Sequence, residues 1–102
     1  MLKHIENKTQ FEEAIKAQKK VLVDFFAVWC GPCNALSPIL EDIASEHEEM
    51  DILKIDVDKV PDVAAQYGIQ SIPTLILFEE GKAIDMRLGY MPKESVLRFA
   101  KL

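Results

Sequence analysis

The sequence predicts an α/β fold: a single domain over residues 1–102, with a central mixed sheet of four to five strands flanked by four helices. A chain of 102 residues that is 49% hydrophobic and 28% charged suits one compact domain. Its apolar segments change period every ten to fifteen residues, as alternating strands and helices do. No internal repeat or Gly/Ser-rich linker divides the chain.

The first half of the chain predicts a strand, a helix and a buried strand. After a short strand at 3–6, the segment Thr9-Gln10-Phe11-Glu12 has the form of a capping box, and we expect its helix to end near Lys19. The run 21–28 is apolar, β-branched and aromatic, which is typical of a strand covered on both faces. The carboxylate of Asp24 is the exception within that run.

A second helix is expected after Cys33, because the apolar residues that follow it recur at helical spacing. The remaining elements are, in order, a strand at 52–57, a helix from Pro61 to Gly68, a strand at 74–78, a hairpin turn at Glu80-Gly81, a strand at 83–88 and a helix from Pro92. The strand at 83–88 alternates apolar and polar residues, so we expect one wet face and a place at the edge of the sheet.

Charge and hydropathy exclude several classes of function. The net charge of −5 leaves no phosphate-neutralising surface, so neither nucleic acid nor an anionic membrane is an expected partner. No apolar stretch approaches the roughly 20 residues of a membrane-spanning helix. The polar start of the chain lacks a signal-peptide core, and we therefore expect a cytoplasmic protein. We also expect a monomer.

The two cysteines carry the chemistry. Cys30 and Cys33 form a Cys-x-x-Cys pair at a predicted strand-to-helix junction. Unpaired amides at a helix N-terminus favour a thiolate, so Cys30 is the predicted nucleophile. Cys33, one turn later and more buried, is predicted to resolve the mixed disulfide that Cys30 forms with a substrate.

Two other interpretations of the pair stay open at this point. Half of a zinc site would need two further ligands, for which His4 and His47 are the soft candidates, and neither has ligand spacing. An inert structural disulfide is the other interpretation, although closing so short a loop constrains the unfolded chain little. The proximity of the pair to a βαβ pattern favours redox chemistry.

The chain resembles the thioredoxin family. The residues that carry the resemblance are Phe25 to Cys33, Pro38, and the segment Tyr67 to Thr74 with its Ile-Pro-Thr. The resemblance covers essentially the whole chain and implies the thioredoxin fold. It also implies a thiol-disulfide oxidoreductase with no bound cofactor, which reduces protein disulfides and is recharged by a thioredoxin reductase that uses NADPH.

The resemblance gives roles to two charged residues. Asp24 shares a strand face with Leu22 and Phe26, so its carboxylate is expected to be desolvated, with a raised pKa. It is then expected to take the proton from Cys33, through water; the alternative for Asp24 is a structural residue whose hydrogen bonds are satisfied nearby. Lys54 matches the family's lysine near that carboxylate, where its positive charge would partly oppose the rise; the alternative for Lys54 is an ordinary solvated residue.

The resemblance also implies a docking rim. Pro73 matches the family's cis-proline beside the cysteines, which leaves the backbone of Ile72 free for an extended substrate. With Ile72, the rim comprises Trp29, Gly31, Pro32, Gly89 and, unless it is an ordinary exposed aromatic, Tyr90. Gly31 and Pro32 also tune the redox potential, and Gly-Pro is the pair of the reducing members of the superfamily.

Two positions depart from the common family pattern. Asn34 stands where a basic residue is usual, and Phe26 stands where many members have Trp. The loss of a positive charge beside Cys33 bears on thiolate stabilisation and on the choice of partner. A function of another class also stays open, namely a binding subunit of this fold whose thiols are not essential.

Overall fold

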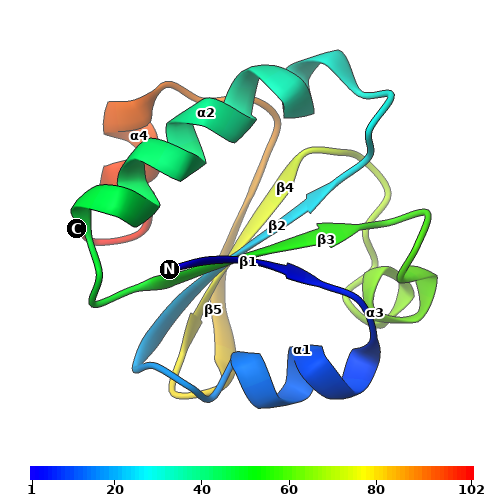
Figure 1. The fold of residues 1–102 in the computed structure, drawn as a ribbon. Coiled ribbons are helices and arrows are strands. Elements are labelled where there is room, and N and C mark those ends of the chain that lie inside the picture. Colours follow the sequence, from blue (N-terminus) through cyan, green and yellow to red (C-terminus); the bar gives the residue numbers. More distant parts are fainter.

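A computed structural model describes residues 1–102 and contains one five-stranded sheet in the order β1-β3-β2-β4-β5 (Figure 1). The expected α/β fold with four helices is therefore confirmed. The elements are β1 (Leu2–Ile5), α1 (Lys8–Ala14), β2 (Lys20–Phe26), α2 (Gly31–Glu46), β3 (Asp51–Asp56), α3 (Pro61–Gln66), β4 (Thr74–Glu79), β5 (Lys82–Leu88) and α4 (Lys93–Phe99).

The sheet is mixed, as predicted. Strand β3 pairs in parallel with both β1 and β2, whereas β4 is antiparallel to β2 and to β5. The central strand β2 therefore has neighbours on both sides, and β5 forms an edge. In this register Asp24 of β2 lies between Lys54 of β3 and Leu75 of β4.

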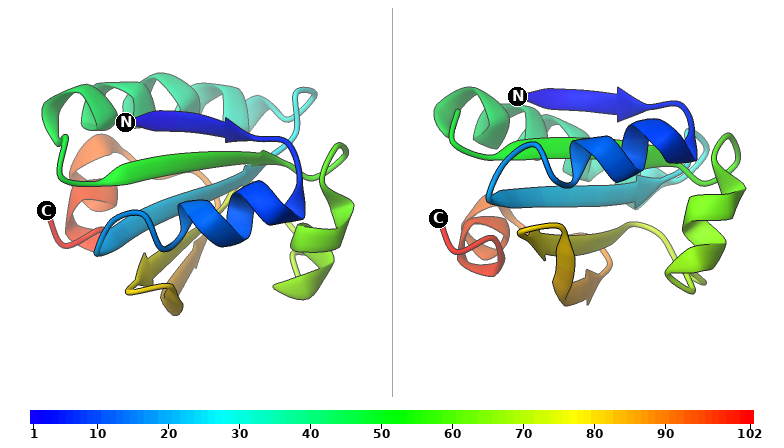
Figure 2. Two further views of the ribbon diagram at one scale, coloured as in Figure 1. Left: turned by 60° about the horizontal axis from the view of Figure 1, so that its bottom comes forward. Right: turned by 90° about the horizontal axis from the view of Figure 1, so that it is seen from below.

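Helices cover both faces of the sheet. Figures 1 and 2 show α2 and α4 on one side, and α1 and α3 on the other. Successive side chains of a strand point to opposite faces, so β2 supplies Leu22 to the core beneath α2 and α4 but Val23 to the core beside α1 and α3. We call these two sides the α2/α4 face and the α1/α3 face.

Helix α1 begins and ends earlier than the sequence predicted. Its N-cap is Asn7, whose Oδ1 accepts a hydrogen bond of 2.9 Å from the Gln10 amide, so Thr9 lies inside the first turn. The side chain of Gln10 in turn accepts from the Glu6 amide at 2.9 Å. Asparagine caps helices as well as threonine does. Asn7 is the cap here because its side chain and that of Gln10 form these two hydrogen bonds. The helix ends at Ala14, well before Lys19.

Strand β5 lies at the edge, but the prediction of one wet face was wrong. All seven of its residues are exposed. Its pairing with β4 shifts register between Leu77 and Phe78, so that Ile84 has no partner across the ladder. Such a bulge bends and twists an edge strand, and the apolar side of β5 is left without a covering helix.

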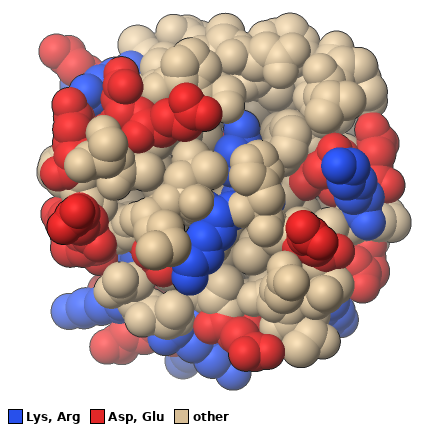
Figure 3. Space-filling view, viewed as in Figure 1, with Lys and Arg blue, Asp and Glu red and all other residues tan.

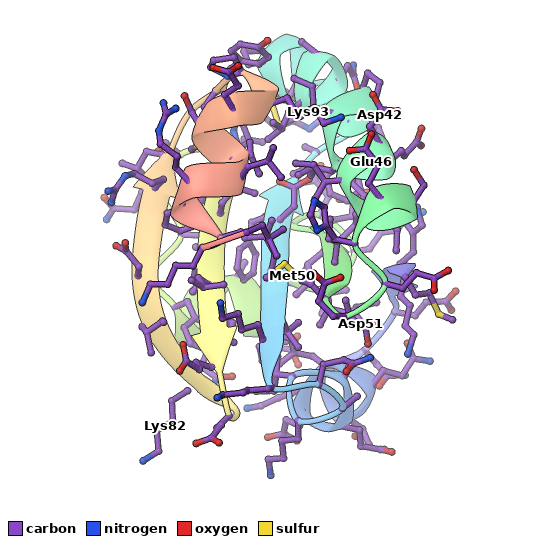
Figure 4. All side chains as sticks on the ribbon, turned by 90° about the vertical axis from the view of Figure 1, so that its left-hand side faces the viewer. Asp42, Glu46, Met50, Asp51, Lys82 and Lys93 are labelled. Atoms are coloured by element: carbon purple, nitrogen blue, oxygen red, sulfur yellow. A yellow bond between two sulfur atoms is a disulfide. The ribbon has the colours of Figure 1, made fainter.

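The helices of the α2/α4 face also meet each other directly. Figure 4 shows Lys93 of α4 reaching toward Asp42 and Glu46 of α2. The Lys93 ammonium lies 2.7 Å from the Glu46 carboxylate, and this hydrogen bond lowers the pKa of Glu46. The contact ties α4 to the C-terminal half of α2, far along the helix from Cys30 and Cys33. None of the four helices combines the length and the apolar character needed to cross a membrane.

Candidate functional site

The cysteine pair occupies the N-terminus of α2. Cys30 is the N-cap, and Pro32 stands in the first turn, where its fixed backbone angle favours helix initiation. Cys30 and Cys33 are joined as a disulfide, with their Cα atoms 5.3 Å apart. Cys30 Sγ also accepts a hydrogen bond of 3.2 Å from the Cys33 amide. The first sulfur therefore lies where the helix presents its unpaired N–H groups.

The loop before β4 lies against the cysteines. The Ile72–Pro73 peptide bond is cis, as the family resemblance implied, and Pro73 is buried. The carbonyl oxygen of Ile72 lies 3.8 Å from Cys30 Sγ. The loop after β5 lies against the loop that holds Pro73, because the Gly89 amide donates a hydrogen bond of 2.8 Å to the Pro73 carbonyl. Gly89 has a φ of 86°, which glycine adopts without strain. Two loops thus meet beside Cys30.

Asp24 is fully buried in the α2/α4 face. Neither of its carboxylate oxygens has a hydrogen-bond partner. Removal from water disfavours the charged form, and this desolvation raises the pKa of Asp24 to about 7, although the positive charge of Lys54 opposes the rise. The expected desolvation and raised pKa are confirmed, and the carboxyl changes protonation state near neutral pH.

Lys54 is buried beside Asp24, so its interpretation as a solvated strand residue was wrong. Its ammonium lies 3.8 Å from Asp24 Oδ2, which is within ion-pair range but too long for a hydrogen bond. The ammonium instead donates to the hydroxyl of Ser37 at 2.8 Å and lies 4.5 Å from the centre of the Phe26 ring. Phe26 therefore provides an aromatic face for a cation.

An exposed apolar rim surrounds the disulfide. Trp29 is 70% exposed and is held by a hydrogen bond of 2.9 Å from its indole nitrogen to Asp58. The other expected rim residues are exposed or half-buried: Gly31, Pro32, Ile72, Gly89 and Tyr90. In Figure 3, the surface over the start of α2 and the connection from β2, at the upper right, carries no charged residue. The surface over the start of α2 is thus uncharged.

Asn34, one of the two departures from the family pattern, faces away from the sulfurs. It is exposed, and its side-chain amide donates to the carbonyl of Val28 at 3.3 Å. The contact ties the first turn of α2 to the preceding loop. A neutral side chain therefore fastens this loop without adding positive charge.

Sequence reasoning missed three residues of the site. Ser37 follows Cys33 by one helical turn, and this spacing on the buried stripe of α2 was the available signal. Asp58 anchors Trp29 from beyond the end of β3, and Val28 is an exposed apolar neighbour of the rim. No local pattern marks these last two, since their roles arise from loop placement.

The cysteine pair lies outside the two largest cavities of the protein. The two largest cavities, of about 710 and 630 Å³, lie by Lys19 and the C-terminus and by Lys3 and α1, and neither includes a cysteine. No group of three or more His, Cys, Asp or Glu side chains is placed to hold a metal ion. The two cysteines are bonded to each other, which is the arrangement of a redox pair.

Comparison with known proteins decides the family. The thioredoxin family model matches residues 3–101. The chain belongs to the thioredoxin family. It is 42% identical over 100 residues to the thioredoxin of Mycoplasmoides gallisepticum, covering 98% of this chain and all of that protein. The thioredoxin of Staphylococcus aureus is 51% identical over 76 residues, which cover 74% of this chain and 73% of the relative.

Solved thioredoxin structures share the fold. Plasmodium falciparum thioredoxin superposes with a TM-score of 0.90 at 31% identity, covering 97% of this chain and 96% of that one. Oxidised mitochondrial thioredoxin 3 of Saccharomyces cerevisiae also gives 0.90, at 30% identity and with 98% and 93% covered. The predicted fold and family are confirmed. This thioredoxin-family protein is a thiol-disulfide oxidoreductase whose redox group is its own Cys30–Cys33 pair.

Proposed function

We propose that this protein reduces disulfides of partner proteins, with Cys30 as the nucleophile, Cys33 as the resolving thiol and Asp24 as the base for Cys33. The observation that carries the proposal is the placement of the pair. Cys30, which is 5% exposed, is the N-cap of α2 beside the rim, whereas Cys33 is 1% exposed and lies on the buried side of α2. We therefore assign the attack on the substrate to Cys30, and the transfer of a proton to the buried Asp24 to Cys33.

In the first step, the Cys30 thiolate attacks one sulfur of the substrate disulfide. A bond forms between Cys30 and that sulfur, the substrate S–S bond breaks, and the second substrate sulfur leaves as a thiolate that takes up a proton. The Cys33 amide, 3.2 Å from Cys30 Sγ, and the N-terminal end of α2 stabilise the negative charge on Cys30.

In the second step, Asp24 accepts the proton of Cys33, through water, and the Cys33 thiolate attacks Cys30. The Cys30–Cys33 bond forms, the mixed disulfide breaks, and the remaining substrate sulfur leaves as a thiolate. The substrate has gained two electrons and the pair has lost them. A base with a pKa of about 7 is suited to this transfer, because it is partly ionised at neutral pH and becomes neutral on accepting the proton.

The rim is the proposed docking surface for the substrate. Trp29, Ile72, Pro73 and Gly89 border Cys30, and the Ile72 amide and carbonyl make no backbone hydrogen bond within the chain. An extended substrate chain can therefore pair with Ile72 while its disulfide faces Cys30. Such pairing recognises the backbone of the substrate and not its side chains. This mode of binding suits a protein that reduces several disulfide substrates.

A thioredoxin reductase that uses NADPH is the proposed source of electrons, and the cytoplasm is the proposed compartment. Family membership supports the first, and the exposed Gly31-Pro32 dipeptide between the two cysteines supports a reducing role in a compartment that keeps thiols reduced. Lys54 is proposed as the modulator of Asp24, because its ammonium is the positive charge nearest to that carboxylate.

Trapping of mixed disulfides tests the assignment of the two sulfurs. Cys33→Ser is expected to accumulate covalent adducts with a disulfide substrate, because Cys30 attacks and nothing resolves the product. Cys30→Ser, the matched control, is expected to form none and to lose turnover. Adducts would be measured by mass spectrometry of the intact protein, with disulfide-bonded insulin as the substrate. Adducts confined to Cys30→Ser would reverse the assignment.

A further inference from the structure

Ser37 is a polar residue on the buried side of α2. It follows Cys33 by four residues and so lies on the same stripe of the helix as Cys33, Leu40 and Ala44, which face the sheet. Its hydroxyl accepts a hydrogen bond of 2.8 Å from the Lys54 ammonium. The mechanism described above gives this residue no role.

The Lys54 ammonium is held by neutral groups while a carboxylate lies nearby. Ser37 accepts one of its protons, and the Phe26 ring lies 4.5 Å from the nitrogen. Asp24 Oδ2 is 3.8 Å away, and both oxygens of Asp24 lack a hydrogen-bond partner. A buried cation and a buried carboxylate with free lone pairs would ordinarily close to hydrogen-bond distance, since such bonds are short and strong.

We propose that Ser37 is a positioning residue that holds the Lys54 ammonium away from the Asp24 carboxylate and thereby preserves the basicity of Asp24. The proposal rests on the proposed function, in which Asp24 serves as the base. A direct hydrogen bond from Lys54 would stabilise the ionised carboxylate and make it a weaker base. Ser37 satisfies the ammonium on the helix side, and Phe26 supports it from the sheet.

The other charged and titratable groups around Lys54 do not offer a nearer partner. His4 of β1 pairs with Lys54 in the sheet register, and a cavity of about 460 Å³ is lined by Lys54, His4, Glu6, Asp56 and Lys59. From α2, Cys33 is bonded to Cys30 and carries no titrating proton in this oxidised state, and β4 contributes only apolar Leu75 opposite Asp24. Asp24 is the one carboxylate within 4.0 Å of Lys54 Nζ. An ammonium released by Ser37 therefore has Asp24 as its nearest free acceptor.

The direct test is an NMR titration of the Asp24 carboxyl carbon in the oxidised protein. Ser37→Ala is expected to lower the pKa of Asp24 by about 1, the low end of the effect of an adjacent cation. Ser37→Thr keeps the hydroxyl and is expected to leave that pKa near its original value. Ser45→Ala is the matched control, because Ser45 lies on the same helix, is exposed and bonds only to the Asp42 carbonyl. An unchanged or raised pKa in Ser37→Ala would overturn the proposal.

A double-variant cycle tests whether Ser37 acts through Lys54. In a Lys54→Met background there is no ammonium to reposition, so adding Ser37→Ala is expected to leave the pKa of Asp24 unchanged. The same decrease in both backgrounds would overturn the proposal, because Ser37 would then act on Asp24 without Lys54. Thermal unfolding of each variant, followed by circular dichroism, verifies that the compared proteins are folded.

The pH profile of turnover separates this inference from the proposed function. In Ser37→Ala the acid limb of the profile is expected to move down in pH together with the pKa of Asp24. A lowered pKa with an unmoved acid limb would support the positioning role of Ser37 and contradict the role of Asp24 as base. An unmoved pKa would overturn the positioning role and leave the roles of the two cysteines intact.

Discussion

The two faces of the sheet both bury apolar clusters, but only the α2/α4 face also buries the charged pair Asp24 and Lys54. On the α1/α3 face, Phe11 packs edge-to-face with Tyr67 and Phe78 at 5.8 Å, within a cluster of fourteen buried apolar residues. The α2/α4 face has a comparable apolar cluster, but beneath the start of α2 it also buries Asp24 and Lys54. The α1/α3 face contributes only to stability, whereas the α2/α4 face contributes to stability and also keeps the ionisable groups of Asp24 and Lys54 largely out of contact with solvent.

A single strand serves both faces. Val23 and Phe25 of β2 enter the α1/α3 core, whereas Asp24, between them, points to the opposite side. The apolar face holds the strand in register, so the carboxylate cannot move toward solvent. We infer that the free energy gained on the α1/α3 face offsets the cost of burying Asp24 on the other. Changes on the two faces should therefore separate stability from redox chemistry.

The largest expected effect on stability comes from Phe11. Phe11→Ala removes a fully buried ring from the α1/α3 face and is expected to lower the free energy of unfolding by about 3 to 5 kcal/mol. The pKa of Asp24 and the reduction potential of the folded variant are expected to stay unchanged. Chemical denaturation measures the first, and NMR titration and redox equilibration measure the others. A changed potential would show that the two faces are coupled.

An effect of comparable size, but one that depends on pH, is expected from Asp24. Its pKa rises from 3.8 to about 7 on folding, so the folded protein binds the proton more tightly and stability falls as pH rises through that window. This loss amounts to roughly 4 kcal/mol between pH 4 and pH 8. Asp24→Asn is expected to lack this part of the pH dependence and to turn over more slowly near neutral pH.

Denaturation of the wild type and of Asp24→Asn at both pH values provides the comparison. The difference between their unfolding free energies should change in favour of the variant as pH rises. Phe11→Ala is the control, because it leaves Asp24 in place and should retain the pH dependence of the wild type. Parallel pH curves for the wild type and Asp24→Asn would contradict the burial of a titrating carboxyl.

Much of this division is visible in the sequence. The apolar run around Asp24 predicts a covered strand, and a lone carboxylate within such a run predicts a buried charge. The Cys-x-x-Cys spacing predicts the redox pair in the same local way. The spacing of Ser37 after Cys33 places it on the buried stripe of α2, but its contact with Lys54 depends on how α2 lies across β3, and that spacing does not encode the crossing.

The local errors have a common cause. Asn7 and Thr9 both suit an N-cap, and the choice depends on which one forms a reciprocal pair with Glu6 and Gln10. Ile84 suits a buried strand position, but the register shift in β5 leaves it beside the ladder. In both cases residue type permits two arrangements, and a hydrogen-bond pattern decides between them.

The reduction potential of the Cys30/Cys33 couple tests the central claim most directly. The protein would be equilibrated with glutathione or dithiol buffers, where a tenfold change in the equilibrium constant corresponds to about 30 mV. An electron donor to protein disulfides is expected to have a potential below the roughly −220 to −260 mV extracted for cytosolic glutathione, near the −270 mV or so characteristic of thioredoxins. A potential well above the glutathione range, or no reversible couple, would contradict the proposed reductase.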